Sequence, residues 1–164
     1  ELILSTGVAT STGSIVVNFG TAPAENDWIF IGMSVMNENN VVTPPASPGT
    51  WVVEDSGTNL NTFSLWKVYK KLAGASEPTS YTFTISLDDA TAAAGVTIRG
   101  ANLTTPLAAK VNTAITTAST SITTGAITYP AAIFQLMFAG VFGAAATGSG
   151  TAQWTADGAL FEIR

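Results

Sequence analysis

Alternation of apolar and polar residues with a period of two is the strongest pattern in this chain. It is cleanest in Tyr81–Leu87, where every second residue is aromatic or aliphatic and threonine and serine lie between them. Phe63–Lys71 alternates less strictly, and Trp66 falls on the face opposite Phe63 and Tyr69. Such alternation predicts strands with one face in a core and the other in water.

Other segments add to the prediction of a sheet. Trp28–Met36 is apolar at nearly every position, as expected for a central strand covered on both faces. The prolines of Val41–Thr50 exclude a helix and a central strand. Turns are expected at Asp55–Asn61 and Gly74–Pro78, which are rich in turn-forming residues. Asp88–Gly95 is expected to be a loop or one helical turn.

The remaining segments complete an all-β chain. Within 102–124, a helix at Pro106–Ile115 and extended structure at Thr113–Ile122 both stay open. Further strands are expected at Ser14–Phe19, Trp51–Val53, Val96–Arg99, Gly125–Tyr129, Ala131–Phe142, Gln153–Ala156 and Ala159–Ile163. About 8–10 short strands with turns between them predict an antiparallel β-sandwich with little helix. We expect a single domain over residues 1–164, in which residues 1–13 form an N-terminal arm.

The amino-acid composition excludes several kinds of functional site. The chain has no Cys and no His, which removes disulfides, thiolate metal sites and the commonest nucleophile–base pairs. Charged residues make up 10% of the chain, against about 25% in typical soluble domains. A surface of so little charge indicates either that copies or partners cover much of it, or that it is the Thr/Ser-rich surface of a secreted domain.

Charge also limits the partners. The net charge is −5, and residues 1–66 contain six acids and no Lys or Arg. Nucleic acid is therefore not expected as a partner, because phosphate binding requires a basic surface. The trio Lys67, Lys70 and Lys71 is interpreted as a solvated strand end. Ala131–Ala146 is shorter than the ~20 residues that a membrane-spanning helix needs, so no membrane span is expected.

A succession of short motifs between residues 26 and 102 carries a family resemblance. The motifs are Asn26-Asp27-Trp28-Ile29-Phe30, Thr43-Pro44-Pro45 leading to Gly49-Thr50-Trp51, Trp66-Lys67-Val68-Tyr69-Lys70, Ala75-Ser76-Glu77-Pro78 before Tyr81-Thr82-Phe83, and Val96-Thr97-Ile98 before Arg99-Gly100. This succession resembles the jelly-roll domain of bacteriophage virion surface proteins, of the capsid decoration, cement or tail-fibre type. The resemblance implies a structural role on the virion surface, commonly as a trimer, with no catalytic residues and no cofactor.

Carboxylate pairs are the remaining candidates for catalysis. They are Glu25/Asp27, Glu54/Asp55 and Asp88/Asp89, all expected in turns. A glycosidase needs two carboxylates across a cleft, and Ca²⁺ could use the same oxygens with Asn26. Adjacent acids in turns are more often solvated, so we expect neither an enzyme nor a metal site.

The four tryptophans are the candidate ligand or interface residues: Trp28, Trp51, Trp66 and Trp154. Aromatic faces bind sugar rings, although Trp28 and Trp51 stand at strand starts, where core packing is the commoner role. The sequence thus favours a non-enzymatic structural protein of a phage particle that binds copies of itself and major capsid or tail proteins. A carbohydrate-binding adhesin that recognises a host glycan is the alternative.

Overall fold

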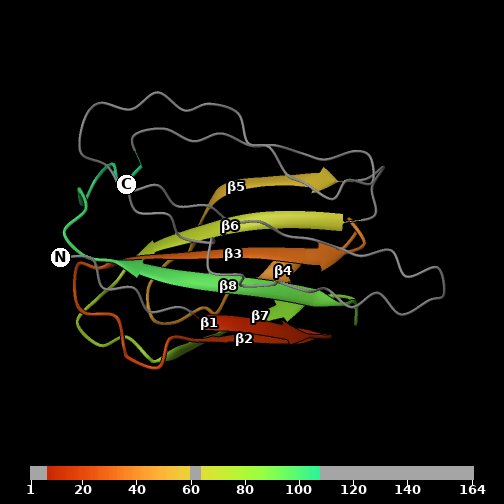
Figure 1. Cartoon of the computed structure of the whole chain (residues 1–164), viewed down its shortest axis with the longest axis horizontal. Helices are drawn as coiled ribbons and strands as arrows, with labels where there is room; N and C mark the ends of the chain where they lie inside the picture. Colours follow the sequence, from red (N-terminus) through yellow and green to blue (C-terminus); the bar gives the residue numbers. More distant parts are fainter. Residues whose placement is uncertain (1–6, 60–63, 108–164) are drawn as a thin grey trace.

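The computed structural model describes residues 7–59 and 64–107, and these residues form eight strands and no helix (Figure 1). The strands are β1 Gly7–Ser11, β2 Ser14–Asn18, β3 Trp28–Met36, β4 Val42–Thr43, β5 Val52–Asn59, β6 Ser64–Leu72, β7 Ser80–Ile85 and β8 Thr91–Ile98. They build two antiparallel sheets, one in the order β1-β8-β3-β6-β5 and one in the order β2-β7-β4. The predicted all-β sandwich is confirmed.

The strand pairs are nested along the chain. β1 pairs with β8, β2 with β7 and β3 with β6, so residues 7–36 run back against residues 64–98. This nested antiparallel pairing places the described strands in the two facing sheets of a β-sandwich. β5 extends the larger sheet by pairing with β6, and the loop from residue 44 to residue 51 carries the chain across from β4.

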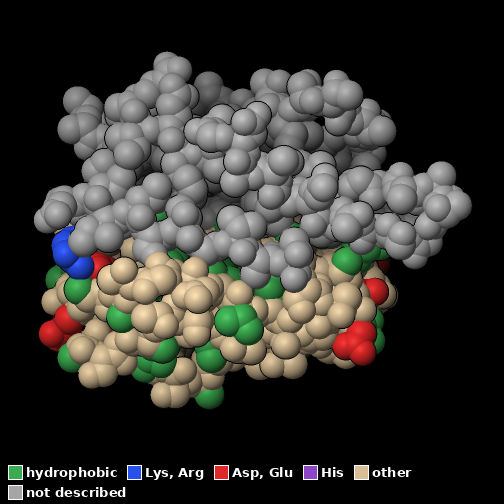
Figure 2. Space-filling model, turned by 60° about the horizontal axis from the view of Figure 1, so that its bottom comes forward, with side chains coloured by type: hydrophobic (Ala, Val, Ile, Leu, Met, Phe, Trp, Pro, Cys, Tyr) green, Lys and Arg blue, Asp and Glu red, His purple; other side chains and the backbone are tan. Residues whose placement is uncertain are grey.

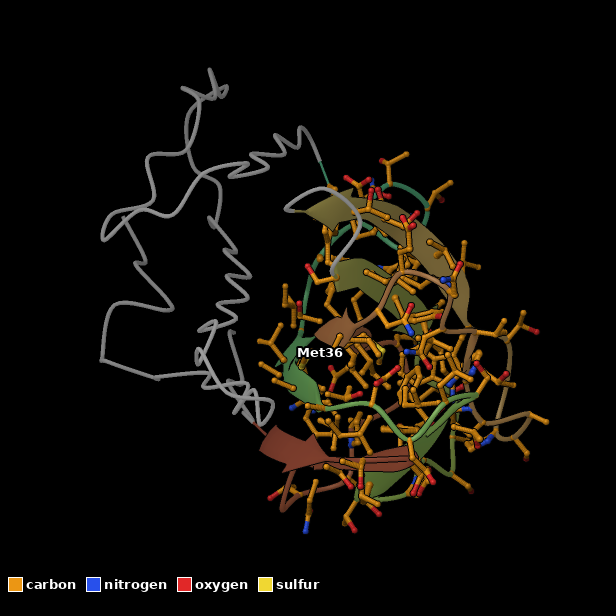
Figure 3. All side chains as sticks on the ribbon, turned by 90° about the vertical axis from the view of Figure 1, so that its right-hand side faces the viewer. Met36 is labelled. Carbon is orange, nitrogen blue, oxygen red and sulfur yellow. The ribbon has the colours of Figure 1, made fainter. Side chains whose placement is uncertain are left out.

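The core lies between the two sheets. Figure 3 looks along the strands from the end where Met36 ends β3, and side chains fill the space between the layers. β7 buries alternate residues as the period of two predicts, and β2 does the same. The large buried side chains of this core include Ile15, Val17, Ile29, Ile31, Met33, Val35, Trp51, Tyr69, Tyr81 and Phe83.

The larger sheet is buried on both faces along β3 and β8. Trp28 and Phe30 point away from the core, where they pack with Val96 and Ile98 in a second apolar cluster. Phe30 is 1% exposed, so this outer cluster also excludes solvent. The prediction that Trp28–Met36 is a central strand covered on both sides is confirmed.

Several boundaries differ from those that the sequence predicts. Thr91–Ile98 is one continuous strand, so the loop or helical turn expected for most of Asp88–Gly95 is wrong. The turn expected at Asp55–Asn61 is wrong up to residue 59, because β5 runs through to Asn59. β7 ends at Ile85, which leaves Leu87 42% exposed rather than in the core.

The N-terminal segment joins the fold. Gly7–Ser11, expected within an arm, forms β1 and pairs with β8. The chain then changes sheets at Gly13, whose φ of +73° suits a residue without a side chain. Most of Pro106–Ile115, together with every strand expected beyond residue 107, lies outside the described residues.

Candidate functional site

Trp51 lies in the core between the sheets, immediately before β5. It is 8% exposed, and its indole meets the rings of Tyr81 and Phe83 edge-on, with centroids 5.1 and 5.4 Å apart. Edge-to-face contacts of this kind add to the stabilisation that apolar burial gives. Trp51 is therefore a packing residue.

Trp28 and Trp66 belong to the outer face of the larger sheet. Trp28 is 7% exposed, and its Nε1 donates a hydrogen bond to the Asn102 carbonyl at 2.9 Å. Trp66 is partly exposed, and its indole lies over Gly57 on the neighbouring strand. Trp154 lies outside the described residues. Trp66 is thus the described tryptophan with surface left for a ligand or a neighbouring subunit.

In the carboxylate pair Glu25/Asp27, one side chain is exposed and the other is buried. Glu25 is exposed, whereas Asp27 is 2% exposed and receives two hydrogen bonds from Arg99, at 2.8 and 3.0 Å. The backbone N–H of Ala24 donates to Asp27 Oδ2 at 2.9 Å. Burial raises the pKa of Asp27, but these hydrogen bonds and the charge of Arg99 outweigh it and hold the pKa below its ordinary value.

The other two pairs also contribute to the fold. Glu54 and Asp55 lie in β5 rather than in the expected turn, and Glu54 forms an ion pair with Lys70 at 2.5 Å. Asp89 accepts a hydrogen bond from Asn40 Nδ2 at 2.8 Å, while Asp88 is exposed. In each pair at least one carboxylate is therefore held by a neighbouring residue of the sandwich.

The described residues contain no group of three or more Asp, Glu, His or Cys side chains that could hold a metal ion. Within the same two ranges, 7–59 and 64–107, no helix is long and apolar enough to cross a bilayer.

Lys71 and Glu77 form a buried ion pair at the end of β6. Lys71 Nζ lies 2.6 Å from Glu77 Oε2, and the two side chains are 2% and 1% exposed. Tyr81 donates its hydroxyl to the same Oε2 at 2.7 Å, and the N–H of Gly74 donates to Oε1 at 2.7 Å. Lys71 Nζ also donates to the carbonyl of Pro48. The cluster thus ties the β4–β5 loop to the turn between β6 and β7.

Two aromatic rings lie beside the Lys71–Glu77 ion pair. Lys71 Nζ lies 5.7 Å from the ring centroid of Trp51 and 5.4 Å from that of Tyr81. Burial raises the pKa of Glu77, but the hydrogen bonds from Lys71, Tyr81 and Gly74 and the charge of Lys71 outweigh it, so the pKa lies below its ordinary value. Burial and the Glu77 carboxylate both raise the pKa of the Tyr81 hydroxyl.

These contacts change the interpretation of the basic trio. Lys71 is buried and Lys70 is paired with Glu54, so the expectation of a solvated strand end is wrong for both. The sequence did contain a signal for Lys71, which stands in the same alternating register as Leu65 and Tyr69, the inward side of β6. Pairing also neutralises Asp27 and Glu54, two of the acids that make the N-terminal part of the chain acidic.

The outer face of the smaller sheet carries no charged residue. Its members are exposed and mostly hydroxyl-bearing; they are Ser14, Val16, Asn18, Thr43, Thr82 and Thr84, and we call this set the hydroxyl face. Ser14 lies opposite Thr84 and Thr84 opposite Thr43, so three side chains form one row across three strands. Val16 is 47% exposed in the next row, opposite Thr82.

On the side of the molecule that Figure 2 shows, charge gathers away from the middle of the described surface. Figure 2 brings the β1–β2 side forward, and the charged side chains of its described part lie near the two ends. Uncharged side chains cover the described surface between them. The alternation in Tyr81–Leu87 already indicated this arrangement, because its threonines fall on the side that faces water.

No protein-family model, no curated protein and no solved structure matches this chain.

Proposed function

We propose that this chain is a non-enzymatic structural subunit of a phage particle, a capsid decoration or cement protein or a tail appendage, which acts by oligomerisation and surface packing. The nested antiparallel pairing in two facing sheets supports the proposal, since it agrees with the jelly-roll fold that the motif resemblance implies. The hydroxyl face carries the proposal furthest, because it offers a charge-free contact surface on a chain of net charge −5.

Charge explains why this face would be the contact surface. Copies of an acidic chain repel one another wherever their acids meet, and a charge buried at an interface without a partner is costly. A face of hydroxyl and methyl groups avoids both penalties. The acidic N-terminal part is a weaker candidate for docking, because Asp27 and Glu54 are already paired with Arg99 and Lys70.

The test combines self-association with particle binding. Light scattering at micromolar concentration should give a multiple of the 16.8 kDa chain mass, a trimer being the state that the resemblance implies. The protein should also sediment with phage particles that lack it. A stable monomer that does not bind particles would remove the proposal.

Two matched variants locate the contact. Thr84→Glu places a charge at the centre of the hydroxyl face and should abolish association, whereas Thr21→Glu places the same charge on an exposed loop and should leave it intact. Equal association by the two variants would show that the hydroxyl face is not the contact.

Partly exposed Trp66 favours a second candidate, a carbohydrate-binding adhesin. Here a glycan array should show binding to host polysaccharide that Trp66→Ala abolishes while the fold persists. Binding of particles without binding of glycans would favour the structural subunit.

A further inference from the structure

The Lys71–Glu77 pair combines a nucleophile, an electrophile and the groups that a condensation between them needs. The amine nitrogen lies 2.6 Å from Glu77 Oε2, and Oε2 is bonded directly to Cδ, the carbon that the nitrogen would attack. Both side chains are at least 98% buried, and the rings of Trp51 and Tyr81 lie beside the amine. An ion pair on the surface has neither the fixed contact nor the exclusion of water.

We propose that Lys71 Nζ and Glu77 Cδ condense to an amide, which cross-links the end of β6 to the turn before β7. This modification is independent of the proposed function, since it concerns a site between the sheets rather than the outer surface. It needs no cofactor and no oxidant, because both reactants belong to the chain.

The step balances within the cluster. The Lys71 ammonium first gives a proton to Glu77 Oε2, which it already contacts, and leaves a neutral amine beside a carboxylic acid. The nitrogen lone pair then attacks Cδ, and a C–N bond forms as the bond from Cδ to Oε2 breaks. Oε2 leaves as water, carrying its own proton and a second one released by the nitrogen. One amine and one carboxyl group become one amide and one water molecule.

Three neighbouring groups suit this reaction. The N–H of Gly74, 2.7 Å from Oε1, would stabilise the negative charge that develops on that oxygen. The Tyr81 hydroxyl, 2.7 Å from Oε2, is placed to relay the second proton: it gives its own to the leaving oxygen and regains one from the nitrogen. The Pro48 carbonyl orients the amine by accepting a hydrogen bond from it. The amide product keeps one N–H, which can still donate to Pro48.

Burial and proximity supply the driving force. Groups held in contact react as if at concentrations on the order of 10⁵–10⁸ M, when their geometry is correct. A buried ion pair retains a desolvation penalty that its attraction only partly offsets, and a neutral amide removes that penalty. The released water leaves a site from which bulk water is excluded, so the reverse hydrolysis lacks its reactant.

The hydrogen bonds to Glu77 favour its ionised form, so the neutral amine and acid are a minor population. A modification that happens once in the lifetime of a molecule requires only a slow rate. The ion pair is the form that the chain adopts on folding, and the amide accumulates from it.

Intact mass spectrometry of the full chain is the direct test. The mature protein should be lighter than the 16.8 kDa sequence mass by one water molecule, and this difference should persist in denaturant. A protease that cuts after Leu72 should leave the two sides of the cut joined through residues 71 and 77. A mass equal to the sequence mass after prolonged incubation of the folded protein would overturn the proposal, and so would a water loss that maps to other residues.

Two variants test the assigned roles. Lys71→Arg keeps the positive charge but lacks the amine nucleophile, so its mass should equal that of its sequence. Tyr81→Phe keeps the ring and removes the proton donor, so the mass change should appear at least tenfold more slowly after refolding. If the Tyr81→Phe variant loses water at the parent rate, the role given to this hydroxyl is wrong. If the Lys71→Arg variant loses water, the cross-link itself is wrong.

Discussion

Gly57 and Trp66 lie opposite each other in the β5–β6 pairing, and a Cβ added to Gly57 would stand 2.8 Å from the nearest indole atoms. A rigid, partly exposed ring on the larger sheet therefore rests on a residue that has no side chain. The absence of a Cβ at residue 57 fixes the position of Trp66, the described tryptophan with surface left for contacts.

Gly57→Ala should destabilise the protein by about 1–3 kcal/mol, the usual cost of forcing an extra methyl group into a packed contact. Urea unfolding measures the change, and Thr58→Ala, at an exposed neighbour, should be near neutral. In the background Trp66→Leu the effect of Gly57→Ala should largely disappear. An equal effect in both backgrounds would mean that the indole is not the obstacle.

The Asp27–Arg99 ion pair should make stability depend on pH. The pKa of Asp27 is lowered in the folded protein, so folding is favoured by this group above the ordinary value of 3.8. As the pH falls below 3.8 and then through the folded pKa, the contribution is lost. Asp27→Asn should therefore be less stable than the parent at pH 7, and the gap should narrow on acidification. A gap that stays constant in denaturant titrations from pH 7 to pH 2 would contradict this prediction.

Asn40 should be far more sensitive to substitution than its neighbour Asn39. The buried Asn40 amide donates to Met36, Asn37 and Asp89, and its oxygen accepts a hydrogen bond from the Leu87 backbone. Asn40→Ala removes these four hydrogen bonds from a side chain that is itself buried and should cost about 2–3 kcal/mol.

The matched control for Asn40→Ala is Asn39→Ala, since Asn39 is exposed and should change stability by less than about 0.5 kcal/mol. Asn40→Asp should be destabilised most at neutral pH, because two carboxylates then face each other at residues 40 and 89. Thermal unfolding of the three variants at pH 7 and pH 4 measures these effects. Equal losses from Asn39→Ala and Asn40→Ala would count against the role of the buried amide.

Gly95 brings β8 into close contact with Val17 of the smaller sheet and with Phe19. A Cβ added there would lie 2.4 Å from Phe19 Cζ and 2.9 Å from Val17 Cγ1. Gly95→Ala should therefore cost about 1–3 kcal/mol. Adding Phe19→Leu to Gly95→Ala should recover part of that loss. If calorimetry shows an unchanged melting temperature for Gly95→Ala, the packing between the sheets is looser than described.

The pattern of apolar and polar residues was sufficient to predict the strands that carry bulky side chains. Tyr81–Leu87 alternates so cleanly that its inward face could be assigned up to Ile85, and the strand Trp28–Met36 matches β3 at both ends. In these segments, the residues that favour a strand are also the residues that fill the core, so propensity and packing agree.

The strands β5 and β8 could not be predicted in the same way. Thr91–Ile98 is rich in alanine, which favours a helix, yet it lies between β1 and β3, where Gly95 leaves room for Phe19. β5, the last strand of the larger sheet among the described residues, contains Asp, Gly and Asn, which are typical of turns. A register shift between Val53 and Asp55 interrupts its pairing with β6. In both cases neighbours distant in the sequence decide the structure.

The candidate site was predictable only in part. The threonines of β7 pointed outward in the sequence pattern, but their row with Ser14 and Thr43 depends on which strands pair. The register of Lys71 with Tyr69 was a signal for its burial, but the basic trio was interpreted as a solvated strand end. Its contact with Glu77 and Pro48 depends on two loops whose course the sequence pattern does not determine.

The pairing of β1 with β8 has a consequence for synthesis on the ribosome. Residues 7–11 emerge before their partners at residues 91–95, which are translated 80 to 88 residues later. At roughly 5–20 residues per second, β1 waits on the order of ten seconds before it can pair. Throughout that interval the nascent chain presents unpaired, apolar strand edges, so holding chaperones and a low growth temperature are the conditions that protect it from aggregation.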